Sequence, residues 1–327
     1  MKAIVVKEGL EGRPLAWEEV PAPRPGTGEV LMKVHAAALN RADLAQRAGT
    51  YPPPPGASDI LGLEVAGRIA GLGAEVSGWE VGDEACVLLS GGGYAELVAA
   101  PAGLLMRVPD GWSLTEAAAL PEAYITAYLN LFGDGRLEQG ETVLIHAGAS
   151  GVGLAAIQLA TAAGARVIVT VGSDRKAEFC TSIGAHAAIN YREQDVAEAV
   201  AAATDGEGVD LVIDLVGARH FEANIASLKR GGRLVFISAI SGRKVELDIS
   251  KVMSRRLVIT GSTLRRRSLA EKAGLVEGLT ARFGRHFESG LIRPVIDSVF
   301  PIEEAGAAHQ RMADDLNIGK IVLKVRE

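Results

Sequence analysis

The sequence has few residues of the kinds that build disulfide scaffolds, metal clusters or nucleic-acid surfaces. Its 327 residues include two cysteines and six scattered histidines, too few for a disulfide framework or a structural zinc cluster. Aromatic residues make up 5% of the chain and are not interleaved with basic ones. With 34 basic and 40 acidic side chains, the formal net charge is −6, which gives no general attraction to phosphate backbones or anionic lipid. We therefore expect a reducing compartment, and neither a nucleic acid nor a membrane as partner.

The sequence also lacks a clear targeting or membrane-spanning segment. Lys2 and Lys7 bring charge into the first residues before a signal-peptide core could form. The longest stretch without Asp, Glu, Lys or Arg, residues 142–165, is long enough to span a membrane. It contains His146, Gln158 and four glycines, however, and divides into a short strand, a turn and a helix. We predict a cytoplasmic protein.

The middle of the chain alternates between apolar, β-branched runs and helical patterns. The expected strands are residues 142–146, 166–171, 187–189, 209–214, 233–238 and 257–260, and the expected helices are residues 153–163, 174–183, 195–203 and 220–228. Because parallel strands need a crossover connection that can hold a helix, this alternation is typical of a parallel sheet covered on both faces. Six strands also match a doubly wound, dinucleotide-binding sheet. The sequence therefore predicts an α/β fold with a Rossmann sheet.

The two ends of the chain have a different pattern. The first part has expected strands at residues 30–39, 63–72, 84–89 and 94–99, with one short helix at 41–48. The last part has a long helical pattern at 269–287, then a strand, a helix at 302–312 and a final strand at 320–325. A chain of this length holds about two domains. We predict a parallel-sheet domain at 123–265 that is inserted into a β-rich, barrel-like domain made of residues 1–122 and 266–327.

A glycine-rich turn follows the first strand of the predicted sheet. Its form is Gly148-x-Ser150-x-x-Gly153, with serine in place of the middle glycine of the G-x-G-x-x-G pattern. One glycine permits the turn, the next position lets the backbone approach a pyrophosphate, and the third lets the helix pack on the strand. The helix N-terminus then offers unpaired N–H groups to the phosphates. Between a buried strand and a helix, the turn predicts a dinucleotide site made by Gly148, Ser150, Gly151, Val152 and Gly153.

The residues after the second strand indicate which nucleotide is bound. NAD-binding sheets carry Asp or Glu there, about 20 residues after the glycines, to hydrogen-bond the ribose 2′-hydroxyl. Gly172 takes that place here, and Ser173 and Lys176 can donate to a 2′-phosphate, with Tyr191 as a further donor. Alternatively, Ser173 only caps a helix whose first turn is solvated, and Asp174 could serve NAD. The missing acid and the adjacent cation favour NADPH.

With this fingerprint in place, the chain resembles the zeta-crystallin-like NAD(P)H:quinone oxidoreductases of the medium-chain dehydrogenase/reductase superfamily over essentially its whole length. The matching segments are residues 38–43 (ALNRAD), 49–54 (GTYPPP), 62–67 (GLEVAG), 146–153 (HAGASGVG), 189–191 (INY) and 317–322 (NIGKIV). Together these segments are specific for the family, although each of them alone would be modest evidence. The resemblance implies that the β-rich domain is GroES-like.

The resemblance also bears on zinc, because zinc-dependent alcohol dehydrogenases share the fold. Their motif G-H-E-x-x-G has a histidine ligand, whereas this chain has Leu63 there, and leucine cannot bind zinc. Neither Cys86 nor Cys180 lies near Asn40, where a cysteine ligand would be needed, and catalytic zinc normally has three protein ligands. We expect no metal, and a structural role for Glu64.

By the same resemblance, Asn40 and Tyr51 line the substrate cleft close to the nicotinamide. Tyr51 would hydrogen-bond or protonate a developing oxyanion, and Asn40 would hold the substrate or the carboxamide. Two structural roles fit these residues equally well: Tyr51 can stack on the prolines at 52–55, and Asn40 can cap the helix at 41–48. Hydride transfer to an electron-poor acceptor chiefly requires orientation and exclusion of water.

The remaining cofactor contacts follow from where the strands end. A ligand of an open parallel sheet lies across the carboxyl ends of the strands. The residues placed there are Leu215, Gly217, Ile237, Ser238, Thr263 and Leu264, and the resemblance adds Thr126 and Asn317. Three arginines at 265–267 precede a helix start, where the dipole disfavours cations. We interpret them as a solvated hinge, with an anionic neighbour as the alternative.

These patterns predict a zinc-independent, NADPH-dependent reductase that transfers hydride or electrons to quinones. A 2-alkenal or enone reductase on the same scaffold is an alternative, because both kinds of acceptor are conjugated electrophiles. A non-enzymatic nucleotide-binding, crystallin-like or RNA-binding protein is another, although the acidic balance argues against RNA. The exposed edge strand at 257–260 predicts a symmetric homodimer. The physiological acceptor and the choice between one- and two-electron reduction stay open.

Overall fold

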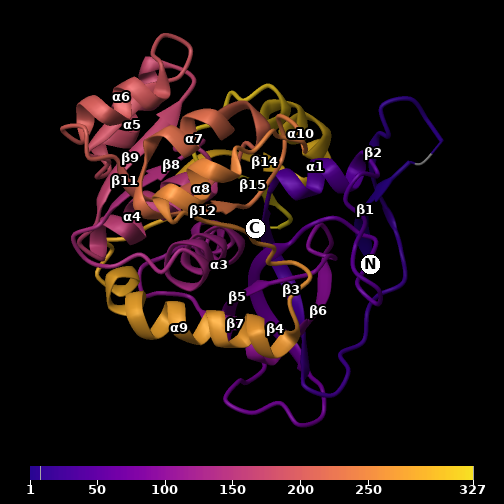
Figure 1. Ribbon diagram of the computed structural model, residues 1–327. Helices are drawn as coiled ribbons and strands as arrows, with labels where there is room; N and C mark the ends of the chain where they lie inside the picture. The colour runs from indigo at the N-terminus through magenta and orange to yellow at the C-terminus, as the bar shows by residue number, and fades with distance from the viewer. Residues whose placement is uncertain (8, 327) are drawn as a thin grey trace. The chain divides into compact units, whose positions relative to one another are not determined.

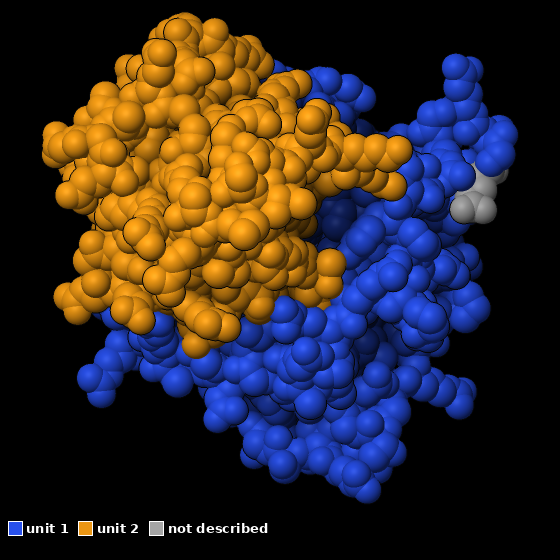
Figure 2. Space-filling model, in the orientation of Figure 1, with its two compact units in different colours: residues 1–125, 265–327 blue, residues 126–264 orange. Residues whose placement is uncertain are grey.

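The computed structural model describes residues 1–7 and 9–326 and divides into two compact units. Unit 1 consists of Met1–Ile125 and Arg265–Glu327, and unit 2 consists of Thr126–Leu264 (Figure 2). The two ends of the chain therefore fold together, and the middle folds as a unit of its own. The predicted limits of the folding domains, 122/123 and 265/266, stay a prediction, because they concern segments that fold independently.

Unit 2 is built on a six-stranded parallel sheet with the order β10-β9-β8-β11-β12-β13. Strands β8, β9, β11 and β12 of this sheet are labelled in Figure 1. The strands are β8 (Thr142–Ile145), β9 (Arg166–Val171), β10 (Ala187–Asn190), β11 (Val209–Asp214), β12 (Leu228–Phe236) and β13 (Val258–Gly261). From β8 the chain builds outward through β9 and β10, then returns to the other side of β8 with β11. This reversal is the switch point of a doubly wound sheet. The predicted Rossmann sheet is confirmed.

The helices of unit 2 connect these strands. They are α4 (Gly151–Ala162), α5 (Asp174–Ser182), α6 (Val196–Ala203), α7 (Phe221–Ser227), which follows the short turn η3 (Ala218–His220), and α8 (Ile249–Arg255). Helices α4, α5 and α6 each begin after a side chain that accepts a backbone N–H of the first turn: Ser150, Ser173 and Asp195. Helix α8 was not predicted. Its Ile249 and Met253 are 67% and 74% exposed, so no apolar face marks it in the sequence.

Unit 1 is rich in β-structure. Its seven-stranded sheet has the order β14-β15-β3-β4-β5-β7, β6 pairs with β3, and β1 and β2 form a separate antiparallel pair. The strands are β1 (Lys2–Val6), β2 (Leu15–Glu19), β3 (Glu29–Ala38), β4 (Glu64–Leu72), β5 (Glu84–Leu88), β6 (Leu97–Pro101), β7 (Leu105–Arg107), β14 (Ile296–Pro301) and β15 (Lys320–Lys324). The predicted β-rich domain is confirmed, although β1, β2 and β7 were not predicted.

The helices of unit 1 lie between and after these strands. They are η1 (Ala102–Leu104), α1 (Arg41–Arg47), α2 (Leu114–Ala117), α9 (Leu269–Glu288), η4 (Ile302–Glu304) and α10 (Ala305–Ala313). Helix α3 (Pro121–Tyr128) carries the chain into unit 2, where the π-helical turn η2 (Leu129–Asp134) follows. The predicted helices at 41–48, 269–287 and 302–312 therefore correspond to α1, α9, and η4 with α10.

One strand pairing brings the two ends of the chain together. Strand β15 pairs antiparallel with β3, so that Val322 lies opposite Ala38. The backbone N–H of Leu39 donates to the carbonyl of Ile321 at 2.9 Å. Since β3 also pairs with β4, this arrangement places Lys320 beside Asn40 and Glu64, residues that are far apart in the sequence.

Candidate nucleotide site and acceptor residues

The turn between β8 and α4 can be made only with small residues at two positions. A Cβ on Gly148 would lie 2.6 Å from Cβ of Val169, and a Cβ on Gly153 would lie 2.4 Å from the carbonyl oxygen of Ala147. Ala147 itself has a positive φ of 53°. Ser150 is the N-cap of α4, and its Oγ accepts the Gly153 N–H at 3.0 Å. This capping role explains why serine can stand where the pattern has its middle glycine.

Helix α4 begins at Gly151, directly after this turn. The N–H groups of Gly151 and Val152 lie in the first turn of the helix, where no preceding turn supplies a carbonyl. Both residues are partly exposed. Together with the positive end of the helix dipole, they can bind a phosphate group.

The carboxyl end of β9 leaves little space for a side chain at position 172. A Cβ on Gly172 would lie 2.9 Å from the Tyr191 hydroxyl oxygen and 3.4 Å from Nε of Arg192. Ser173 follows directly, and Lys176 lies in the first turn of α5. The structure therefore brings Gly172 and Tyr191 close together, with Arg192 beside them. Sequence reasoning missed Arg192, although its position directly after Tyr191 could have identified it.

Ser173 and Asp174, at the start of α5, each make a hydrogen bond that bears on their alternative roles. Ser173 does cap α5, since its Oγ accepts the Lys176 N–H at 3.4 Å, but a hydroxyl that accepts one bond can still donate another. The Asp174 carboxylate accepts a hydrogen bond from Nδ2 of Asn190 at 2.9 Å. Asp174 is therefore tied to the end of β10, which makes it less suited to bind a ribose.

The loops after β11 and β12 are in direct contact. A Cβ on Gly217 would lie 2.8 Å from Cα of Ala239, and the positive φ of Gly217, 96°, also favours glycine. The backbone N–H and the hydroxyl of Ser241 both donate to the carbonyl of Val216, each at 2.9 Å. This contact places the predicted residues Leu215 and Gly217 in the same loop pair as Ile237 and Ser238. Thr263 and Leu264 follow the end of β13.

A buried hydrogen-bond chain lies beneath these loops. His146 bonds through Nδ1 to the Thr170 hydroxyl at 2.8 Å and through Nε2 to Oδ1 of Asn224 at 2.6 Å. Nδ2 of Asn224 donates to Asp214, whose other carboxylate oxygen accepts the Gly217 N–H at 2.8 Å. Burial lowers the pKa of His146 to about 4, so the imidazole is neutral and serves as a structural link. Sequence reasoning noted His146 only as part of the turn.

In unit 1, the side chain of Asn40 belongs to a buried ionic network. Nζ of Lys320 donates to Oδ1 of Asn40 at 2.7 Å and to Oε1 of Glu64 at 2.6 Å. Nδ2 of Asn40 donates to the same Glu64 oxygen at 2.9 Å, and the other oxygen accepts the Glu122 N–H at 2.8 Å. Asn40 is also the N-cap residue of α1. Because its amide already has these partners, the structural interpretation of Asn40 is favoured over direct contact with substrate.

Tyr51 lies in the loop after α1, beside a buried cation. The guanidinium carbon of Arg265 is 5.4 Å from the centre of the Tyr51 ring. Arg265 donates to the carbonyl of Ser90 and, through Nη2, to Oε1 of Gln46 at 2.6 Å. Burial raises the pKa of Tyr51, so the phenol stays protonated at neutral pH. No hydrogen bond between the side chains of Tyr51 and Asn40 is found among residues 1–7 and 9–326.

The interpretation of residues 265–267 as a solvated hinge is wrong for Arg265. Its side chain is only 4% exposed, whereas Arg266 is exposed as expected. The pattern of three arginines gave no sign of this, because the partners of Arg265 come from residues 46 and 90.

Two further predicted site residues, Thr126 and Asn317, make local hydrogen bonds. The carbonyl of Thr126 accepts a hydrogen bond from Nδ2 of Asn130, and Nδ2 of Asn317 donates to the carbonyl of Gly319, each at 2.7 Å.

Matches to known proteins extend over essentially the whole chain. Residues 26–110 match the family described as alcohol dehydrogenase GroES-like domain, and residues 151–277 match that described as zinc-binding dehydrogenase. The quinone oxidoreductase of Lama guanicoe is 32% identical over 330 residues, covering 100% of this chain and 98% of that protein. The quinone oxidoreductase of Sus scrofa is 31% identical, covering 93% of this chain and 92% of that protein. The chain belongs to the zeta-crystallin-like quinone oxidoreductase family of medium-chain dehydrogenases/reductases.

Solved structures of similar proteins agree with this family and its fold. A mycobacterial protein in complex with NADPH has a TM-score of 0.89 at 33% identity, covering 99% of this chain and 100% of that one. An NAD-dependent alcohol dehydrogenase has a TM-score of 0.87 at 32% identity, with both chains covered completely. The predicted family and the Rossmann and GroES-like architecture are confirmed, and unit 2 is an NAD(P)-binding domain.

Zinc occurs in the description of one matching family, but the residues of this quinone oxidoreductase homologue do not fit a catalytic zinc ion. Leu63 is buried and offers no donor atom. Cys86 and Cys180 lie in different units, and burial raises the pKa of both thiols, that of Cys180 to about 12. In the part of the chain that the structure describes, no group of three or more His, Cys, Asp or Glu could hold a metal ion. We derive no step through a metal.

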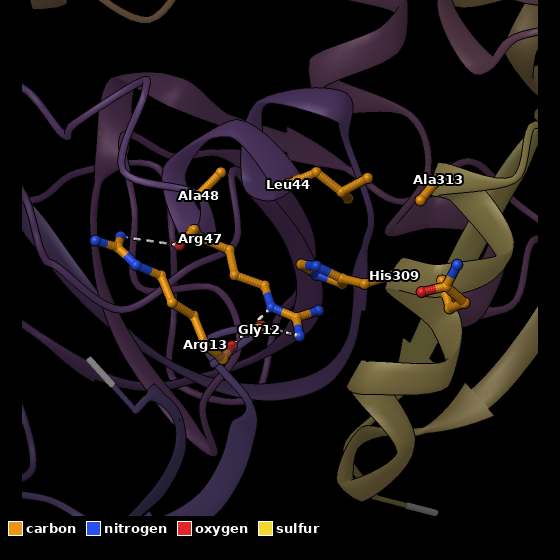
Figure 3. Close-up of a pocket in the computed structure, with 8 residues that line it drawn as sticks. Gly12, Arg13, Leu44, Arg47, Ala48, His309 and Ala313 are labelled. Carbon is orange, nitrogen blue, oxygen red and sulfur yellow. Dashed lines mark hydrogen bonds between the residues drawn. The ribbon is translucent and has the colours of Figure 1, made fainter. Parts of the chain in front are cut away.

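Figure 3 shows a separate pocket of unit 1, with a volume of about 340 Å³. It is lined by residues of α1, of α10 and of the loop between β1 and β2, among them Arg13, Arg47 and His309. Burial and the nearby Arg47 lower the pKa of His309 to about 3, so its imidazole is neutral. None of the predicted site residues lines this pocket, and we give it no role in the reaction.

No helix in the described part of the chain combines the length and the apolar composition that crossing a membrane requires.

Proposed function

We propose that this chain is a zinc-independent, NADPH-dependent reductase of quinones. The observation that supports this most directly is the close approach of Gly172 to the Tyr191 hydroxyl at the end of β9. An acid at position 172, as in NAD-binding sheets, would collide with Tyr191 and would repel a 2′-phosphate. Ser173, Tyr191 and Arg192 instead offer donors and positive charge for that phosphate.

The rest of the proposed nucleotide site follows the strand ends. The first turn of α4, with Gly148, Ser150, Gly151, Val152 and Gly153, would bind the pyrophosphate. The paired loops after β11 and β12 would contact the nicotinamide half, with the buried chain from His146 to Gly217 holding one of them in place. The set is completed by Lys176, Leu215, Ile237, Ser238, Thr263, Leu264, Thr126 and Asn317. NADPH, when bound, supplies the hydride.

On the acceptor side, Tyr51 is the proposed proton or hydrogen-bond donor. No hydrogen bond of its hydroxyl to another described residue is found, and its raised pKa keeps the proton on the phenol. Asn40 would act as a positioning residue, because its amide ties α1 to Lys320 and Glu64. Tyr51 follows α1, so this network fixes the start of the segment that carries the phenol.

The class of acceptor follows from the donor set and from the relatives. With Leu63 in place of a ligand, polarisation of a simple ketone by a metal has no support in this chain. Quinones are electron-poor enough to accept hydride without such help. Relatives of full length that are 31–32% identical carry the name quinone oxidoreductase.

A direct test is oxidation of NADPH and of NADH by the purified protein with a panel of quinones and enones. We expect turnover with quinones and a lower KM for NADPH than for NADH. Faster turnover of enones would replace quinones by enones as the substrate class, and a lower KM for NADH would refute the cofactor assignment. Calorimetry serves as the control: tight binding of NADPH without turnover of any acceptor would favour a non-enzymatic nucleotide-binding role.

We also propose that the protein is a cytoplasmic homodimer. Strand β13 is an edge strand of the sheet in unit 2, and its Val258 is 53% exposed. An apolar edge is therefore open to pairing. A second copy could pair with this edge about a two-fold axis. Light scattering at assay concentration should give twice the mass of one chain, and a monomer would contradict the proposal.

A further inference from the structure

Unit 1 buries two cations, Arg265 beside Tyr51 and Lys272 beside Arg265, and neither has an ion pair among the described residues. Arg265 is 4% exposed and Lys272, in α9, is 5% exposed. Nζ of Lys272 donates to the Ser90 hydroxyl at 2.9 Å and to the carbonyl of Arg265 at 2.8 Å. Nη1 of Arg265 is buried and has no hydrogen-bond acceptor in the described part of the chain. Within residues 1–7 and 9–326, neither cation has a carboxylate at ion-pair distance.

The acidic side chains of this region do not neutralise these cations. Glu64 pairs with Lys320. The Asp43 carboxylate accepts the N–H groups of Asn40 and Gly62 and the Tyr94 hydroxyl. Each acid therefore already has its own donors.

Glu122 is the remaining acid near the two cations. Its Oε2 is buried without a hydrogen-bond partner in the described part of the chain. Burial and the nearby charge of Glu64 raise the pKa of Glu122 to about 8. Glu122 is therefore mostly protonated at neutral pH and contributes little negative charge.

A buried guanidinium with an unused donor and no counter-ion is costly, because desolvation is not offset by an ionic partner. The free donor lies on the residue that packs over the Tyr51 ring, where the proposed acceptor is protonated. We propose that Nη1 of Arg265 binds an anionic group of the acceptor, so that the preferred substrates are acidic quinones, with Lys272 adding a second positive charge. This inference rests on the proposed quinone reductase activity.

The charge of the acceptor is the property to vary. Naphthoquinone and naphthoquinone sulfonate differ in one permanently ionised group, and the ratio of their kcat/KM values in two variants cancels their different intrinsic reactivity. We expect Arg265→Gln to lower the ratio of sulfonate to parent quinone by about ten- to a hundredfold, the usual range for a hydrogen bond to a charged group. Arg266→Gln is the matched control, with the same change at the exposed neighbour, and should leave the ratio unchanged.

The other outcomes overturn the proposal in distinguishable ways. An equal loss for both quinones would show that Arg265 only supports the fold. A higher KM for NADPH with an unchanged ratio would show that the anion bound is the nucleotide's own. If the wild-type protein reduces neither quinone, the proposed function itself fails. If the wild-type protein reduces the parent quinone but Arg265→Gln leaves the ratio of sulfonate to parent quinone unchanged, only the present inference is refuted.

A measurement on the wild-type protein keeps the proposal testable should Arg265→Gln not fold. Naphthalene sulfonate cannot accept a hydride, and the sulfonamide of the same ring is its neutral counterpart. The sulfonate should compete with naphthoquinone at least about tenfold more strongly than the sulfonamide does. Equal inhibition by the two would overturn the assignment of an anion site.

Discussion

Replacement of Lys320 by methionine tests whether the buried ion pair of unit 1 stabilises the fold. Lys320 is 4% exposed, and its Nζ contacts Oε1 of Glu64 at 2.6 Å, Oδ1 of Asn40 at 2.7 Å and the carbonyl of Leu39 at 2.5 Å. The methionine side chain fills a similar volume but leaves these three oxygens without their shared donor. The Glu64 carboxylate then stays buried without a counter-ion.

Loss of one partner from a buried ion pair typically costs about 3–5 kcal/mol. The Glu64 carboxylate keeps two donors, Nδ2 of Asn40 and the backbone N–H of Glu122, so we expect a value near the lower end, about 3 kcal/mol. The double variant Lys320→Met with Glu64→Gln removes both charges. It should be more stable than Lys320→Met alone, because no uncompensated charge stays buried.

Urea denaturation followed by tryptophan fluorescence is the appropriate assay. All three tryptophans, Trp17, Trp79 and Trp112, lie in unit 1, so the signal reports on the unit that contains Lys320. Lys33→Met, at an exposed position of β3, is the matched control and should change stability by no more than about 0.5 kcal/mol. A loss for Lys320→Met no larger than that of the control would refute the reasoning, because the ion pair would then contribute nothing beyond its desolvation cost.

Three further changes have expected outcomes. Tyr51→Phe should lower kcat for quinones by about a hundredfold or more, as expected for loss of a proton donor, with an unchanged KM for NADPH. Unaltered kcat would exclude Tyr51 from the reaction. Gly172→Asp should shift the ratio of kcat/KM from NADPH toward NADH by about tenfold or more, because the carboxylate repels the 2′-phosphate and displaces Tyr191; a constant ratio would show that the phosphate lies elsewhere. The pKa of Glu122 is raised from 4.5 to about 8 in the folded state, so the stability of the wild-type protein should fall as pH rises from about 4.5 to 8, since the unfolded chain releases this proton first. Glu122→Gln should abolish this loss and gain about 3 kcal/mol at pH 7 in the same fluorescence assay, and equal pH profiles would contradict the raised pKa.

The sequence was informative wherever partners lie close together along the chain. The turn from Gly148 to Gly153 and the cap at Ser173 each depend on residues a few positions apart, so spacing alone identifies them. The alternation of strands and helices in unit 2 followed in the same way, because apolar periodicity reflects which face of each element is buried. Helix α8 was missed for the matching reason, since its apolar side chains are exposed.

Tertiary structure alone decided which polar residues are buried and what they contact. Lys320 meets Glu64 across 256 positions of the chain, and Arg265 meets Ser90 across 175. A run of arginines before a helix is solvated in most proteins, and only packing against distant loops buries the first of them here. Local pattern determines which elements form, whereas burial and charge compensation depend on contacts between residues that the sequence keeps far apart.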